Sequence, residues 1–343
     1  MVTIALLFTS CNEDQNDLTN EQTNVDMSDF YLYTDADIDE QNRVADGSKS
    51  CYSMVNLNRL LNQDSKLHKK MYDIEYHTRA NIGSKKPAGA GNGNGNGGSD
   101  PGPGTDDLGV INIPVYVHVI YSNSNQNISS TQINSQIAIL NDDFSATNND
   151  INQVPSEFSG SVADSEITFS LANTFRYSDS RTSWGTNDAM KSAYPPITPE
   201  THLNIWVCNI GGGILGYAQF PGGPLSSDGV VVGPQYFGST GYVASPFDEG
   251  RTTTHEVGHY LNLRHIWGDG RCNRDDFVSD TPTSDAPNYG CPSYPTINCR
   301  SNDMTMNYMD YVDDACMYMF SEGQKSRMRT VFGAGGSRES MVN

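Results

Sequence analysis

Three histidines and a glutamate between residues 255 and 265 have the spacing of a metal site. The stretch HEVGHYLNLRH contains His255, Glu256, His259 and His265. Side chains four residues apart lie one above the other on a helix, so His255 and His259 can reach one zinc ion while Glu256 points toward a water on the metal. A pair of histidines alone also occurs on solvated helix faces. The third histidine argues against that alternative, because three of the seven histidines fall within this stretch.

The segment between His259 and His265 must turn sharply if all three imidazoles are to bind one ion. The helix has to end there, at a residue in the left-handed conformation that favours glycine. Asn262 occupies this position. Asparagine tolerates that conformation better than most residues, so the geometry remains plausible.

Together with a second stretch downstream, this pattern resembles the pappalysin family of metzincin metalloproteases, in its bacterial cytophagalysin branch. The first stretch is HEVGHYLNLRHIWGD, and the second is NYMDY at 307–311. The second resembles the family's Met-turn, which implies that Met309 lies beneath the metal and that Tyr311 binds or hydrogen-bonds at the zinc. The resemblance covers residues 108 to 334.

The resemblance implies a zinc-dependent endopeptidase in which Glu256 takes the proton of the zinc-bound water and Tyr311 stabilises the oxyanion. Gly216, Tyr217 and Ala218 match the strand that pairs with extended substrate, although a plain sheet edge is the alternative. Two other functions stay open: a zinc-binding surface lipoprotein without protease activity, and another zinc hydrolase such as an amidase. Glu256 argues against the first, and the Met-turn argues against the second.

Two sets of aspartates suggest further binding roles. Members of the family with a carboxylate just after the Met-turn tyrosine place it in the S1′ pocket, so Asp314, or Asp313, predicts a preference for Arg or Lys at P1′. These residues could instead be solvated or cap a helix. The turn at 276–282 resembles the family's structural calcium site, with Asp276, Asp280 and Thr281 as the expected oxygen ligands. The alternative is a solvated acidic turn.

The seven cysteines have several predicted roles. Four follow the zinc motif without a CxxC pair, which favours two disulfides over a second zinc site but leaves three pairings open. The resemblance implies the pairs Cys272–Cys299 and Cys291–Cys316. Cys208 is expected to be a buried small hydrophobic residue. Cys51, in CYSM, resembles the pro-segment cysteine of bacterial pappalysins without the glycine that follows it, and predicts a thiolate that blocks the zinc and keeps a zymogen latent.

Length and charge restrict the partners. The chain has 343 residues and a net charge of −20, so we expect no nucleic-acid partner, and no apolar run is long enough to span a membrane. Protein or peptide substrates and a monomer are expected.

Residues 1–11 resemble a signal with a lipobox ending at Cys11, against the alternative of a frayed terminus with a stray cysteine. Acidic residues directly after that cysteine resemble the surface-export signal of Bacteroidetes lipoproteins. We therefore expect an exported protein: an outer-membrane or cell-surface lipoprotein, or one secreted after processing.

The elements that must position these residues follow from composition and periodicity. An acidic leader and pro-segment is predicted over 12–82, with weak order before 50 and a short helix or two over 51–80. Glycine, proline and asparagine at 83–107 indicate a flexible linker. The catalytic domain is predicted over 108–334 and a tail over 335–343. A strand at 110–121, a helix at 131–144 and strands near 166–175, 202–210 and 211–220 indicate an α+β fold. The resemblance implies a twisted, mostly parallel sheet with an antiparallel edge strand, an active-site helix, a Met-turn and a C-terminal helix.

Overall fold

A computed structural model describes residues 25–36, 50–84 and 106–342, so Cys11 and most of the linker lie outside the described residues. The strands are β1 Ser50–Cys51, β2 Ile111–Tyr121, β3 Ile167–Ser178, β4 Leu203–Val207, β5 Ile214–Ala218, β6 Val230–Val232, β7 Tyr289–Gly290, β8 Ile297–Asn298, β9 Ser301–Asn302 and β10 Tyr311–Val312. The α-helices are α2 Ser53–Gln63, α3 Ser65–Ser84, α4 Ser130–Phe144, α5 Ala189–Ala193, α6 Arg251–Tyr260 and α7 Glu322–Thr330. Short 3-10 helices are η1 Ile151–Gln153, η2 Ser159–Ser161, η3 Leu225–Ser227, η4 Pro234–Tyr236, η5 Asp314–Cys316 and η6 Glu339–Met341.

A six-stranded sheet in the order β1-β5-β6-β4-β2-β3 organises the catalytic domain. Strands β3, β2, β4 and β6 run parallel, and β5 pairs antiparallel with β6. The central strands β4 and β6 are buried along their whole length, as expected for apolar strands covered on both faces. The predicted fold class, a mostly parallel sheet with an antiparallel strand at its edge, is confirmed.

Helices α4 and α6 pack against each other and against the sheet. Ser129 begins α4 by accepting a hydrogen bond from the backbone of Gln132, and Ile133, Leu140 and Phe144 form its buried face. The active-site helix α6 is buried along its whole length. It contacts β5 and β6 of the sheet, and its Gly258 lies close to Met309.

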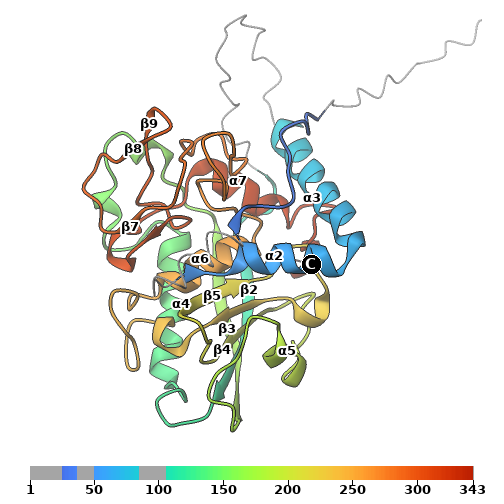
Figure 1. The fold of residues 1–343 in the computed structure, drawn as a ribbon, viewed down its shortest axis with the longest axis vertical. Helices are drawn as coiled ribbons and strands as arrows, with labels where there is room; N and C mark the ends of the chain where they lie inside the picture. Colours follow the sequence, from blue (N-terminus) through green and yellow to red (C-terminus); the bar gives the residue numbers. More distant parts are fainter. Residues whose placement is uncertain (1–24, 37–49, 85–105, 343) are drawn as a thin grey trace, which may run out of the picture.

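The pro-segment packs beside this domain, with α2 and α3 drawn in blue at the right of Figure 1. The two helices share an apolar cluster that includes Met54, Leu57, Leu61 and Met71 and reaches Phe220 of the catalytic domain. Residues 25–36 also pack on the catalytic domain, since the Tyr31 hydroxyl donates to the Gly268 carbonyl at 2.6 Å. The expectation of a weakly ordered leader is therefore wrong for these residues.

Two other expectations need correction. Strand β6 was not predicted, because three valines are too short a run to stand out from the loop around them. Residues 335–342 are not a separate tail: the Arg338 guanidinium pairs with Asp228 at 2.7 Å, and Met341 belongs to the main core. The apparent tail is polar because its arginine, rather than an apolar run, anchors it.

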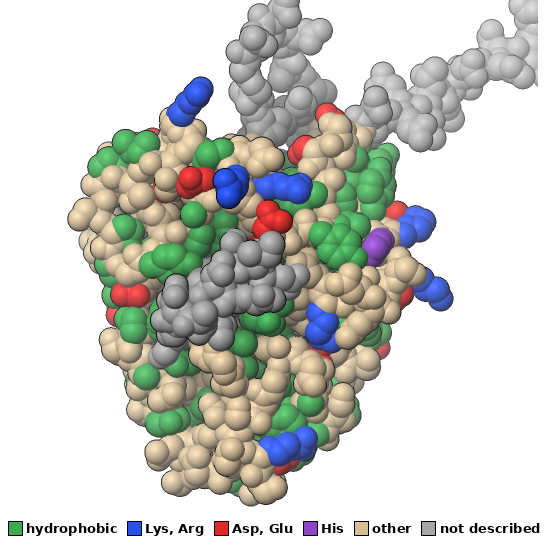
Figure 2. Space-filling model, in the orientation of Figure 1, with side chains coloured by type: hydrophobic (Ala, Val, Ile, Leu, Met, Phe, Trp, Pro, Cys, Tyr) green, Lys and Arg blue, Asp and Glu red, His purple; other side chains and the backbone are tan. Residues whose placement is uncertain are grey.

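The described surface has no dominant charged patch on the face seen in Figure 2, where acidic and basic side chains lie in small mixed groups among neutral and hydrophobic ones. Among the described residues, no helix is long and apolar enough to cross a membrane.

Candidate active site

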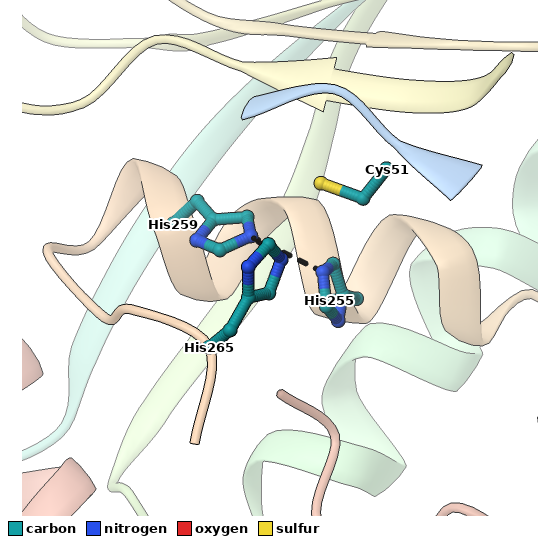
Figure 3. A group of neighbouring side chains, drawn as sticks. All are labelled: Cys51, His255, His259 and His265. Atoms are coloured by element: carbon teal, nitrogen blue, oxygen red, sulfur yellow. Dashed lines mark hydrogen bonds between the residues drawn. The ribbon is translucent and has the colours of Figure 1, made fainter. Parts of the chain in front are cut away.

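Helix α6 and the turn after it bring the three histidines together (Figure 3). His255 and His259 lie on α6, and the chain then turns at Asn262, whose φ of 76° is the predicted left-handed conformation. This turn directs His265 back toward the other two imidazoles. The Nε2 atom of His259 lies 3.1 Å from Nε2 of His255 and 3.1 Å from Nε2 of His265.

The hydrogen bonds of the three Nδ1 atoms fix the tautomer of each imidazole, and therefore the state of its Nε2 atom. The Nδ1–H groups of His255 and His259 donate to the carbonyls of Tyr308 and Leu263 at 2.6 and 2.8 Å. That of His265 donates to Asp269 at 2.6 Å. Each Nε2 therefore presents a lone pair, and burial lowers the pKa of His255 to about 3, so the ring is neutral. Three lone pairs that converge in a buried site need a shared cation, and zinc suits this donor set.

Met309 lies under this arrangement. It is fully buried, and a Cβ added to Gly258 of α6 would lie 2.5 Å from its sulfur. Glycine at this position therefore allows Met309 and its turn to approach helix α6 closely.

Cys51 of the pro-segment faces the histidines. Its sulfur points toward the three rings in Figure 3, and the four potential ligand atoms lie within 4.8 Å of one another. Burial, reinforced by the charge of Glu256, raises the pKa of the Cys51 thiol well above its usual range, and the thiol donates to Glu256 Oε2 at 3.4 Å. A thiolate here would need a cation beside it, which couples its ionisation to metal binding.

Ser53 also occupies the site, and the sequence analysis missed it. Its hydroxyl donates to Glu256 Oε2 at 2.6 Å and accepts from the backbone N–H of Ala218 at 2.6 Å. One side chain thus contacts both the predicted catalytic base and the predicted substrate strand. A serine two residues after a cysteine carries no sequence signal that could have identified this role.

Strand β5 lies over Glu256 and is covered by the pro-segment. A Cβ on Gly216 would lie 3.1 Å from Glu256 Cγ and 2.8 Å from the Val231 carbonyl, so only glycine fits there without displacement. Strand β1 pairs with β5 in parallel, with Cys51 opposite Gly216. The outer edge of β5 is therefore occupied by chain from the pro-segment.

Tyr311 completes this side of the site. Its hydroxyl donates to the Cys51 carbonyl at 3.3 Å, and its ring packs against His265 with 4.8 Å between centroids. A peptide carbonyl thus already lies at the tyrosine hydroxyl.

Asp314 lies in a pocket lined by His255, Glu256 and Tyr311. Its Oδ2 accepts the backbone N–H groups of Glu249 and Arg251 at 2.9 and 3.2 Å, so it caps α6 as well as facing the pocket. Burial raises its pKa to about 7.

The loop between α6 and α7 contains both predicted disulfides, Cys272–Cys299 and Cys291–Cys316. Elsewhere in the chain, Cys208 is buried with a free thiol, as expected.

The candidate calcium residues separate into two groups. The Thr281 hydroxyl donates to Asp276 Oδ1 at 2.8 Å, whereas Asp280 accepts from Ser321 and from the Gly323 N–H at the start of α7.

Known proteins are similar to this chain in sequence and fold. Residues 197–333 match the model of peptidase family M43, described as pregnancy-associated plasma protein-A. An extracellular metalloprotease of Arthroderma benhamiae is 33% identical over 245 residues, which cover 67% of this chain and 76% of the relative. Extracellular metalloprotease 1 of Coccidioides posadasii is 32% identical over 232 residues, covering 65% and 77%.

Two solved structures from Tannerella forsythia are similar. Mature mirolysin in complex with a cleaved peptide has a TM-score of 0.66 and 44% identity, and covers 68% of this chain and 95% of that chain. A promirolysin mutant has a TM-score of 0.72 and 37% identity, and covers 85% of this chain and 96% of that one. The larger share matched by the proform indicates that this chain includes a pro-segment. The chain thus belongs to the pappalysin family of metzincin metalloproteases, related to the cytophagalysin branch, and is a metalloendopeptidase.

Proposed function

We propose that the chain is a zinc-dependent endopeptidase made as a latent zymogen. The observation that carries this proposal is the convergence of three Nε2 lone pairs and the Cys51 sulfur beside Glu256. His255, His259 and His265 would hold the zinc, which when bound polarises a peptide carbonyl and acidifies a water.

The side chains around the zinc ligands supply the proton transfers. Glu256 Oε2 accepts a proton from the attacking water and returns it to the leaving amine nitrogen. The Tyr311 hydroxyl donates to the carbonyl oxygen as negative charge develops on it, which is supported by its bond to the Cys51 carbonyl. Extended substrate pairs with Gly216 to Ala218 of β5 after β1 has left.

Latency in this proposal has three parts. Cys51 takes a ligand position on the zinc, β1 covers β5, and Ser53 engages Glu256 and the Ala218 N–H. Ser53 therefore holds the general base itself, an effect that does not depend on the thiol.

Asp314 supplies the proposed preference for Arg or Lys at P1′. Its carboxylate lies in the pocket next to Glu256 and is buried, so a cationic P1′ side chain would form a charge-assisted hydrogen bond there. The two backbone bonds to Oδ2 hold the carboxylate in place.

We also propose structural calcium near Asp276 and Thr281. Burial raises the pKa of Asp276 well above its usual range, with Asp275 adding to the effect, and a hard cation would relieve both. Asp280 would join only by leaving its bonds to α7. We expect a lower midpoint of thermal unfolding when calcium is removed by a chelator that binds calcium in preference to zinc. Added calcium should restore the midpoint. An unchanged midpoint would exclude the ion.

Export follows from the extracellular relatives, and we propose residues 1–11 as the signal, with acylation at Cys11. The proposed layout is a leader and pro-segment over 12–82, a linker over 83–107 and a catalytic domain from 108. Metabolic labelling with a fatty-acid analogue tests the lipid: label on the wild-type chain but not on Cys11→Ser supports it, and unlabelled wild type refutes it.

The decisive experiment uses the full chain, cleaved in the linker by limited proteolysis and then separated from its pro-segment, with fluorogenic peptides that differ at P1′. We expect cleavage that zinc chelation abolishes, that Glu256→Ala lacks, and that is fastest with Arg or Lys at P1′. No cleavage by folded, zinc-loaded protein would favour a binding lipoprotein instead.

A further inference from the structure

Two buried arginines lie beside the loop that carries the third histidine. Arg264 directly precedes His265 and is 3% exposed, and Arg327 of α7 is 2% exposed. Their guanidinium carbons lie 4.9 and 5.6 Å from the ring centroid of Phe277. We call Arg264, Phe277 and Arg327 the arginine-aromatic surface.

The pro-segment supplies the groups that satisfy this surface. Arg327 donates from both Nη atoms to the carboxylate of Glu75. Arg264 donates from Nη2 to the Tyr31 carbonyl at 2.9 Å, while its buried Nη1 has no hydrogen-bond partner among the described residues. In the described part of the catalytic domain, 106–342, no carboxylate forms an ion pair with either arginine.

The pro-segment also covers the ring of the surface. Phe30 and Tyr31 lie with their centroids 5.7 and 5.1 Å from that of Phe277. These residues belong to the acidic, aromatic stretch DMSDFYLYTDA at 26–36. The intramolecular occupant therefore displays the ligand chemistry that fits: the Glu75 carboxylate from α3, and the Tyr31 carbonyl and two aromatic rings from the 26–36 stretch.

Departure of the pro-segment leaves two neighbouring guanidinium groups without an ion-paired carboxylate, with Asp269 as a nearby negative charge that acts on Arg264. Unpaired charges at a partly desolvated surface are unfavourable, so an acidic ligand is favoured there. We propose that in the activated enzyme the arginine-aromatic surface is an exosite that binds acidic, aromatic-bearing segments of protein substrates. This proposal rests on the proposed zymogen function.

The surface is placed to act together with the cleft. Tyr31 donates to the carbonyls of Gly268 and Asp275, on the loop that follows His265. A substrate held in the cleft can therefore reach the surface with another part of the same chain. A second contact of this kind raises the effective concentration of the cleavable segment.

A binding experiment tests the surface without relying on catalysis. The full chain is activated by linker proteolysis, the pro-segment is removed, and binding of fluorescein-labelled DMSDFYLYTDA is followed by anisotropy. We expect binding that weakens about tenfold or more in Arg264→Gln, in a peptide with Phe30→Ala and Tyr31→Ala, and at high ionic strength. Arg181→Gln removes a half-exposed arginine paired with Asp179 and should leave binding unchanged. If the glutamine variant does not fold, Arg264→Lys should still weaken binding, because it loses the planar guanidinium.

A kinetic experiment then tests the role in substrate binding. The unlabelled peptide should raise the apparent KM for unfolded casein and leave kcat/KM for a short neutral peptide unchanged. Binding that is equal in wild type and Arg264→Gln, inhibition of both substrates alike, or binding without effect on casein would overturn the exosite. Failure to cleave even the short peptide would instead refute the proposed protease function, and the anisotropy result would still decide the surface.

Discussion

The ion pair between Glu75 and Arg327 should control how firmly the pro-segment is held. Both residues are 2% exposed, and they join α3 of the pro-segment to α7 of the catalytic domain. The substitution Glu75→Gln keeps the shape of the side chain and removes its charge. It leaves the Arg327 guanidinium buried without a carboxylate, with the Asn262 carbonyl and one neutral amide oxygen as its acceptors.

Two estimates of the effect agree. Breaking a buried ion pair by removing one partner costs about 3 to 5 kcal/mol. Burial alone would raise the pKa of Glu75, but Arg327, and to a smaller extent Arg79, lower it from the ordinary 4.5 to about 2. This net shift, which combines burial with both arginines, corresponds to about 3 kcal/mol. The equilibrium for opening of the pro-segment should therefore rise about 100-fold or more.

Labelling of Cys51 in the native full-length chain measures this equilibrium. Its thiol is buried, and α2 and α3 share one apolar cluster, so exposure of Cys51 requires the helices to lift together. With labelling slower than reclosing, the rate at Cys51, resolved by mass spectrometry, is proportional to the opening constant.

A matched control lies on the same helix. The Lys69–Asp73 pair is exposed, at 80% and 54% for the two side chains, so Asp73→Asn should change the rate about twofold at most. Equal labelling rates in Glu75→Gln and Asp73→Asn would refute the reasoning, because the buried pair would then contribute no more than the exposed one.

Three further predictions follow from the same contacts. Because the pKa of Glu75 is lowered, the stability that its ion pair contributes is fully present above about pH 4.5 and is lost as the pH falls toward about 2. Labelling of Cys51 with a disulfide reagent that reacts in acid should therefore accelerate over that range in wild type. It should accelerate much less in Glu75→Gln. In the uncleaved chain, Cys51→Ala should stay partly latent and Cys51→Ala/Ser53→Ala should cleave a short peptide at least about tenfold faster; equal rates would exclude a role for Ser53. Asp314→Asn keeps an oxygen for the two backbone bonds but removes the charge, so kcat/KM for a P1′ Arg peptide should fall about tenfold or more relative to P1′ Leu, and an unchanged ratio would contradict the assignment.

The parts of the site that were predictable are encoded in local spacing. A four-residue interval places His255 and His259 on one helix face, and a left-handed residue at Asn262 is the short way to return His265 to them. The alternation and burial of the β2 sequence similarly indicate a strand without reference to distant residues. Local geometry suffices in these cases because the residues involved are neighbours in the chain.

The remaining features depend on contacts between distant segments, and so were not predictable from the pattern. Ser53 and Glu256 are separated by 203 residues, and Glu75 and Arg327 by 252. The acidic residues of the leader suggested solvation because composition does not show that the Tyr31 carbonyl among them lies at the buried Arg264, or that Asp29 pairs with Arg79. Asp26 to Asp35 and Glu75 are unremarkable among 41 acidic residues until the fold places Arg264 and Arg327 beside the segment that carries them.

This arrangement has a consequence for how latency is built. Ligation by Cys51 would block the metal in the proposed zymogen, but the bonds of Ser53, the β1–β5 pairing and the Glu75–Arg327 pair lie at separate places and do not require the ion. Loss of zinc should therefore not by itself release the pro-segment, and cleavage of the linker should not by itself expose the cleft. Activation requires a step that separates α2 and α3 from the catalytic domain, and the buried Glu75–Arg327 pair is one of the contacts that oppose that separation, because parting it leaves a charge without its partner.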